Sequence, residues 1–336
     1  MKKWIAALSA SVLAVSFALL AGCSAVKSDG TISGNYHEAE DADMQQLFDA
    51  LTTDSEKLFG DMDAEGWRFG LHGVADFSFA MAQGTTESRI GADADLAILL
   101  SEGGSGLSVG GSLDLNTESK ADGETQSAQL GIDPYIDDEY VYFNVTSSSS
   151  SASGDSSAEE RGKIARADLG ITAPDLSGLA DQLKQIFGDN LDAVRTNLSD
   201  YGVELAMDTS SGIKARFSFS TEGLQEMIKE MLGSMGYVDT SGYTVNVSSD
   251  TLEVYLMLDA NGAFSACSMR ADFSVTVLDP GFNYFTYLID EDAADLTIEM
   301  SGMFSITSDD ADIVYPSDLA EYPEIDLSDL LPGILG

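Results

Sequence analysis

One stretch decides the fold: Phe69-Gly70-Leu71-His72-Gly73-Val74-Ala75-Asp76-Phe77-Ser78-Phe79-Ala80-Met81. Its odd positions are apolar or small, whereas the polar side chains His72, Asp76 and Ser78 fall at even positions. Successive side chains of a β-strand point to opposite faces of a sheet, so this period of two is typical of a strand with one buried face. We therefore predict a long strand over 69–81.

The same alternation recurs outward from this strand. Residues 90–100 and 107–115 repeat it at full length, and turn-rich breaks at 83–86 and 102–106 separate the runs. Short turns between alternating runs are typical of antiparallel neighbours, so we predict a meander. Further strands are expected at 124–132, 135–145, 203–207, 213–219, 252–258, 267–277, 282–289 and 296–306.

Three segments repeat their apolar residues at a spacing of three and four, which predicts amphipathic helices. Two of them cover 41–60 and 176–198. The third follows the Ser220-Thr221 cap and ends before Gly236. Its apolar stripe consists of Leu224, Met227, Ile228, Met231, Leu232 and Met235.

The strands and helices together predict an α+β protein with one large domain over 42–336. Residues 146–160 are mostly Ser with Gly, Ala and Asp, which predicts a mobile surface loop inside that domain. A domain boundary at this loop is the alternative. The similar pattern of helices and strands on both sides of it favours a single interrupted sheet.

The N-terminus has the charge pattern of an export signal. Met1-Lys2-Lys3 is followed by the uncharged segment 4–21, and the segment ends in Leu20-Ala21-Gly22-Cys23. This ending resembles the lipobox of bacterial lipoproteins, and an uncleaved membrane-spanning helix is the alternative. The resemblance implies a signal peptide over 1–22 and a diacylglycerol on Cys23, which would anchor the protein to the outer face of the cell membrane. The Ser-, Gly-, Asp- and Glu-rich segment 23–41 is expected to be a flexible tether that holds the domain off the membrane.

Composition excludes some partners. The net charge of the 336 residues is -41, so the protein repels phosphate backbones and nucleic-acid binding is not expected. Adhesion to an anionic membrane is also unfavourable without the lipid. Besides Cys23 the chain contains only Cys267, so no disulfide is expected within the domain. Because Cys267 falls on the apolar face of its strand, we predict a buried, inert thiol.

The residues of enzyme sites are largely missing from the sequence. The two histidines, His37 and His72, lie in no recognisable catalytic motif. Residues 61–66 resemble the start of a calcium-binding EF-hand loop, but His72 stands where a bidentate Glu is required. We therefore predict a non-enzymatic protein without a catalytic residue, metal site or cofactor other than the lipid on Cys23.

The layout of the exported part resembles the LolA, LolB and LppX class of lipoprotein carriers. It shares the lipobox, an N-terminal amphipathic helix, a long antiparallel meander and helices inserted between later strands. The resemblance implies a large, curved, half-barrel-like antiparallel sheet with amphipathic helices packed on its concave face, and an acyl chain or lipoprotein held between them. It also implies that the helix after Ser220 lines the ligand site, where flexible thioethers fit irregular apolar ligands. The candidate ligand-facing residues are Leu224, Met227, Ile228, Met231 and Met235.

Three alternatives stay open at this point. One is a surface hydrolase, which requires a cleft where carboxylates with raised pKa values converge. The stripe of apolar residues on that helix is also explained by packing in the core. The whole protein is also explained as a cell-surface interaction or structural module that holds no small ligand. A carrier predicts an apolar cavity between sheet and helices, whereas the module predicts a filled core.

Overall fold

The structure is a computed structural model of the chain. It describes residues 26–52, 55–61, 65, 67–101, 106–152, 154–170, 191–200, 202–234, 244–286, 288–289, 293–308 and 313–325.

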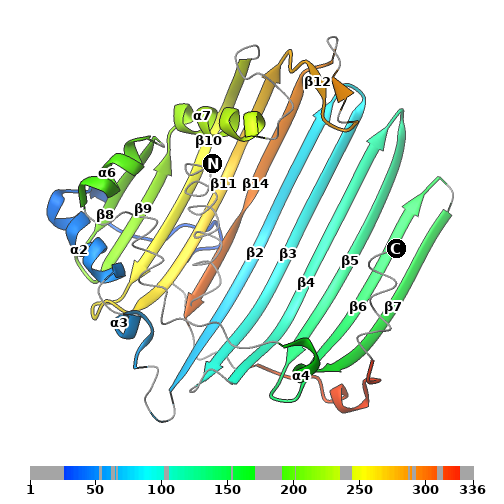
Figure 1. The fold of residues 1–336 in the computed structure, drawn as a ribbon, viewed down its shortest axis with the longest axis horizontal. Helices are drawn as coiled ribbons and strands as arrows, with labels where there is room; N and C mark the ends of the chain where they lie inside the picture. Colours follow the sequence, from blue (N-terminus) through cyan, green and yellow to red (C-terminus); the bar gives the residue numbers. More distant parts are fainter. Residues whose placement is uncertain are drawn as a thin grey trace.

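The described strands form a large antiparallel sheet (Figure 1), as the alternating runs predict. Its twelve strands lie in the order β1-β8-β9-β10-β11-β14-β2-β3-β4-β5-β6-β7. The sheet is not closed, because β1 and β7 lie at its two opposite edges. A separate two-stranded ribbon is made by β12 (Phe282–Asn283) and β13 (Leu288–Ile289). The strands of the large sheet are β1 (His37–Glu38), β2 (Arg68–Gln83), β3 (Thr86–Ser101), β4 (Gly106–Ala121), β5 (Glu124–Ile136), β6 (Tyr140–Ser151), β7 (Gly154–Ala165), β8 (Val203–Asp208), β9 (Ile213–Phe219), β10 (Thr244–Leu258), β11 (Phe264–Leu278) and β14 (Leu296–Ser308).

Two meanders make up this sheet, and β14 joins them. Strands β2 to β7 pair in sequence order, as do β8 to β11. Strand β14 then pairs with β11 on one side and with β2 on the other. The β10–β11 turn contains an Asn261-Gly262 pair, in which Gly262 has a φ of 86° and Asn261 donates its backbone N–H to Asp259 Oδ1.

The register keeps the apolar side chains of neighbouring strands on one face. Leu71 of β2 lies opposite Ile98 of β3, and Ile98 lies opposite Val109 of β4. We call this side of the sheet the apolar face. The other side, the polar face, carries residues such as Asp93 and Asn116.

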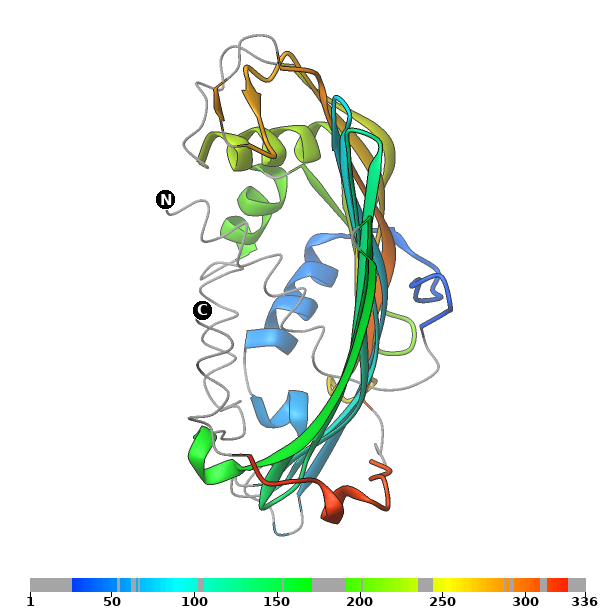
Figure 2. The same cartoon turned by 90° about the vertical axis from the view of Figure 1, so that its right-hand side faces the viewer.

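Several helices of the described chain lie on the apolar side of the curved sheet (Figure 2). They include α2 (Asp41–Thr52), α3 (Ser55–Phe59), α6 (Leu191–Asp200) and α7 (Thr221–Ser234). Leu51 of α2 and Leu58 of α3 are buried in one core cluster with Leu71 of β2 and Ile213 of β9. The predicted helix over 41–60 is therefore present as two consecutive helices, and the predicted helix over 176–198 is described only from Leu191 onward.

The serine-rich segment is not a loop, contrary to our prediction. It forms the end of β6 and the start of β7, which pair in register from Tyr140–Ala165 to Ser151–Gly154. The alternating run before the serines positions β6 beside β5, and backbone hydrogen bonds then extend the hairpin without help from apolar side chains. Side chains add contacts across the hairpin, because the hydroxyls of Ser149 and Ser156 lie 2.9 Å apart.

The segment expected to be a flexible tether is packed against the sheet from Val26 onward. We call residues 26–39 the N-terminal strap. Ile32 is only 3% exposed and packs in a cluster with Tyr255 and Ala266 on the polar face. The strap ends in β1, which pairs with β8 and forms one edge of the sheet. A few apolar residues are enough to order the strap, because the sheet supplies both an apolar surface and partners for its backbone hydrogen bonds.

The C-terminal residues 313–325 also pack on the sheet. Tyr322 contacts Tyr142 edge to face, and the Tyr315 hydroxyl donates to the Ile136 carbonyl oxygen at 2.7 Å. Beside β7, Lys163 donates its backbone N–H to Pro323 O, and Ile325 donates to Lys163 O. The tail therefore covers part of the β7 edge, which would otherwise present unpaired backbone groups.

Candidate apolar binding face

The helix predicted to line a ligand site is present as α7. Ser220 caps its start, because Gly223 donates its backbone N–H to Ser220 Oγ at 3.0 Å. Figure 1 shows α7 crossing β10 and its neighbours. Leu224 is 1% exposed and therefore belongs to the buried side of the helix.

The side chains of the other predicted site residues are not described by the structure. Met227, Ile228 and Met231 belong to the backbone of α7, but their side chains lie outside the described part. Met235 and the lipidation candidate Cys23 lie outside the described residues altogether. The structure therefore brings Leu224 into the core and leaves the ligand-facing role of the stripe a prediction.

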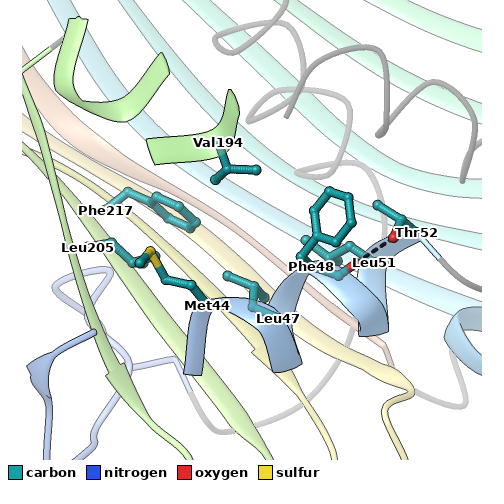
Figure 3. A pocket seen from close by; sticks show the side chains of 8 residues that line it. All are labelled: Met44, Leu47, Phe48, Leu51, Thr52, Val194, Leu205 and Phe217. Carbon is teal, nitrogen blue, oxygen red and sulfur yellow. Dashed lines mark hydrogen bonds between the residues drawn. The ribbon is translucent and has the colours of Figure 1, made fainter. Parts of the chain in front are cut away.

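A small apolar pocket lies between α2, α6 and the strands β8 and β9 (Figure 3). Its volume is about 20 Å³, which is room for about one water molecule. Its one hydroxyl is satisfied, because Thr52 Oγ1 donates to Phe48 O at 2.7 Å. The lining residues are Met44, Leu47, Phe48, Leu51, Thr52, Val194, Leu205 and Phe217.

This pocket is a packed junction rather than a preformed ligand chamber. Ligand sites for small organic molecules usually have several hundred Å³. The spacing of Met44, Leu47, Phe48 and Leu51 predicts the apolar side of a helix, but it does not mark these residues as a site. Nothing in a linear pattern shows that α6 and β9 meet this helix.

The apolar face extends well beyond the helices and is only partly buried over β3 to β6. In one row, Ala94, Leu113, Ile132 and Val145 lie opposite each other across four strands. A neighbouring row joins Ala92, Leu115 and Leu130. None of these side chains reaches full burial, and Ile90 on the same face is 46% exposed. The described structure thus holds a broad apolar surface with partial access.

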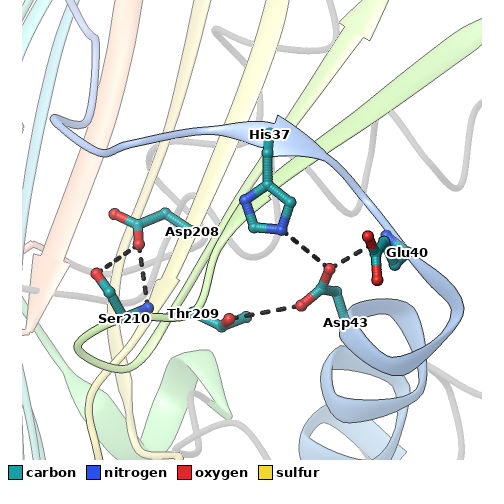
Figure 4. Close-up of polar contacts among 6 residues, drawn as sticks. All are labelled: His37, Glu40, Asp43, Asp208, Thr209 and Ser210. Atoms are coloured by element: carbon teal, nitrogen blue, oxygen red, sulfur yellow. Dashed lines mark hydrogen bonds and ion pairs between the residues drawn. The ribbon is translucent and has the colours of Figure 1, made fainter.

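A group of polar contacts lies where the strap meets α2 and β8 (Figure 4). Asp43 Oδ2 accepts the backbone N–H of Glu40 at 3.1 Å and lies 3.1 Å from His37 Nε2. The Thr209 hydroxyl donates to the other oxygen of Asp43. These bonds cap the N-terminus of α2 and attach it to β1, so we interpret Asp43 as a structural residue.

Asp208 is the second carboxylate of this region and is 4% exposed. The Ser210 hydroxyl and backbone N–H donate to its Oδ1, at 2.6 and 3.1 Å, and the Asn35 backbone N–H donates to Oδ2 at 3.0 Å. The Ser210 hydroxyl, together with the two backbone donors, lowers the pKa of Asp208 to about 2. A carboxylate held ionised by so many donors is suited to fixing the strap rather than to accepting a proton.

Other reactive groups in the described part of the chain show no arrangement typical of catalysis. His72 Nε2 contacts only the exposed carboxylate of Asp95, at 2.7 Å. Cys267 is buried as predicted, and burial raises the pKa of its thiol to about 12. Among the described residues, no three His, Cys, Asp or Glu side chains gather as they would around a metal ion. No helix in the described part is long and apolar enough to cross a membrane.

Comparison with known proteins assigns the chain to no family. No protein-family model matches the chain, and no curated protein matches it. Among solved structures, the chain is similar to a beta-barrel-like protein of the domain of unknown function DUF1849 from Brucella abortus. The identity is 9% and the TM-score is 0.22, over 72% of this chain and 98% of the other. A likeness this distant says nothing about ligand or activity.

Proposed function

We propose that this protein is a membrane-anchored extracytoplasmic lipoprotein that binds a lipid or another apolar ligand on the apolar face of its sheet. The partly buried rows of apolar side chains across β3 to β6 are the observation that carries this proposal. A contiguous apolar surface that folding leaves only partly buried marks a place for a ligand or partner. The proposed lipid anchor on Cys23 comes from the lipobox-like sequence alone.

An elongated ligand suits this surface better than a compact one. The apolar rows run across several neighbouring strands, whereas the pocket beside α2 has room for about one water molecule only. An acyl chain laid along such rows gains about 0.8 kcal/mol for each methylene that it buries. We therefore propose that the apolar face is the concave side of a half-barrel and that the ligand lies along the rows of β3 to β6. In this arrangement α7, which contacts β10, borders the ligand site.

Native mass spectrometry combined with lipid extraction tests the binding. The protein is expressed from Ser24 onward without its anchor, and co-purifying apolar species are measured. Leu115→Lys should remove most of them, because it places a charge in the middle of an apolar row. Asn116→Lys is the matched control, since the neighbouring side chain points to the polar face and should leave ligand binding unchanged. A clean mass for the wild-type protein from lipid-rich preparations would contradict the proposal.

The anchor needs its own test. A Cys23→Ser variant of the full chain should lose incorporation of a labelled fatty acid and leave the membrane fraction, because the thioether can no longer form. Unchanged membrane association of this variant would contradict lipid anchoring at Cys23.

A surface interaction or structural module is the second candidate function. The small volume of the pocket favours it, because the core beneath α2 and α6 is already filled. In that case the protein carries no co-purifying lipid, and Leu115→Lys instead weakens the capture of a protein partner.

A further inference from the structure

We infer that the N-terminal strap fixes the orientation of the protein on its membrane, so that the polar face of the sheet lies against the bilayer and the apolar face is turned away from it. This inference rests on the proposed lipid anchor at Cys23. In this arrangement the lipid is joined to the sheet by the packed strap and a few preceding residues, and not by a long flexible tether.

The strap is held firmly at its membrane-proximal end. Val26 pairs with Ile32 in an isolated β-bridge, and Lys27 donates its backbone N–H to Thr31 O at 2.9 Å. The buried Ser268 hydroxyl of β11 donates to Gly30 O at 2.5 Å. These bonds close the segment into a compact loop on the sheet.

Further along, side chains fasten the strap to the same face. Val26, Ile32 and Tyr36 pack with Tyr255, Met257 and Ala266. The guanidinium of Arg216 lies 5.2 Å from the centre of the Tyr36 ring, a distance suited to a cation–π contact. Lys214 Nζ donates to Ser33 O at 3.0 Å. The strap is thus attached to β9, β10 and β11 from the polar side.

The remaining chain is too short to reach the other side of the sheet past its nearer lateral edge. Cys23 precedes Val26 by three residues, which span at most about 10 Å when fully extended. Strand β10 is separated from the edge strand β1 by three strand spacings, or about 14 Å in all. A lipid on Cys23 therefore cannot pass β1 to the apolar side. In the proposed orientation it enters the bilayer on the polar side, with β10, β11 and β14 closest to the headgroups.

The charge of the polar face indicates which headgroups it tolerates. Asp76, Asp93 and Asp114 lie opposite each other on β2, β3 and β4, and only β14 separates β2 from β11 under the strap. Carboxylates held within about a Debye length of an anionic surface are repelled by it. We therefore expect the docked orientation on bilayers of zwitterionic phospholipid. The apolar face is then open to the surrounding compartment, where a ligand or delivering protein would approach it.

Fluorescence quenching on vesicles tests this orientation. The full lipidated chain is reconstituted in phosphatidylcholine vesicles that contain headgroup-quencher lipids, and a dye is attached either at Asp93→Cys on the polar face or at Ile90→Cys on the apolar face. Cys23 carries the lipid and Cys267 is buried, so the new thiol takes the dye. Quenching at position 93 should be several-fold stronger than at position 90.

A linker variant shows whether the strap causes the difference. A flexible Gly/Ser linker of about twenty residues between Cys23 and Val26 has an average reach of about 25 Å and should make the two positions equally quenched. Equal or reversed quenching in the protein without the linker, while its mass shows the diacylglycerol, would overturn the orientation but leave the anchor intact. A mass without the lipid would overturn both.

Discussion

At the scale of single residues, Asp208 ties the N-terminal strap to the edge of the sheet. Its hydrogen bonds lower its pKa to about 2, so folding favours the ionised form. Because the folded-state pKa is below the unfolded value, this contribution is complete above about pH 4 and is lost as the pH falls through about 2. Acid therefore loosens the strap at this residue.

An Asp208→Asn variant tests this bond network. We expect the free energy of unfolding near pH 7 to fall by about 2 kcal/mol, the usual size for hydrogen bonds to a buried charge. The difference from the wild-type protein should shrink between pH 4 and pH 2 in urea titrations. Asp29→Asn is the control, because Asp29 accepts similar bonds from Thr31 in full exposure. A pH-independent difference would contradict the account.

The aspartate row on the polar face is expected to destabilise the sheet. Asp93 of β3 lies between Asp76 and Asp114, and like charges directly opposite on neighbouring strands repel. An Asp93→Asn variant should therefore have a higher melting temperature, with a gain of about 0.5 kcal/mol that fades at high salt. Glu299→Gln serves as control, because Glu299 faces Ala80 and Ser274 instead. A melting temperature unaffected by Asp93→Asn at low salt would contradict this explanation.

At the scale of elements, Ile32 is the buried apolar side chain of the N-terminal strap. Ile32→Asp places a charge in the cluster with Tyr255 and Ala266, so the strap should detach while the sheet stays folded. Hydrogen exchange measured by mass spectrometry should then increase over residues 26–36 only. Ser33→Asp, a change at the exposed neighbouring position, should leave the exchange unchanged. Protection that persists in Ile32→Asp would show that the backbone bonds alone hold the strap.

The elements predicted well are those with apolar side chains at every second position. Strands β2, β3, β10 and β11 follow directly from this alternation, because burial of one face selects both the conformation and the register. The cap at Ser220 likewise marked the start of α7. The local sequence is sufficient to predict an element where the local pattern and the tertiary contacts favour the same structure.

Two elements were predicted wrongly because their partners lie outside the local sequence. The serines of β6 and β7 are weak strand formers, yet they continue hairpins whose apolar ends fix the pairing. In the strap, Asn35 binds a carboxylate 173 residues away. The polarity of both segments is typical of loops, and only the neighbouring strands make them ordered.

At the scale of the whole molecule, the sheet is continuous because β14 joins the two meanders. The sequence predicted this strand but not its place, since β14 pairs with β2 more than two hundred residues earlier in the chain. Strand order of this kind is set by contacts between distant segments. The position of the apolar rows of β3 to β6 on the same side as α2 and α7 was equally invisible in the linear pattern.

The continuous apolar face is the central feature of the account, and photocrosslinking tests it most directly. A fatty acid carrying a diazirine is bound to the protein expressed from Ser24 onward, irradiated, and located by peptide mass spectrometry. We predict labels on the apolar face, at Leu113, Leu115, Leu130 and Ile132, and none at neighbours on the polar face such as Asn116. Labels spread over both faces, or no labelling above that of an unrelated soluble protein, would contradict the proposed ligand site.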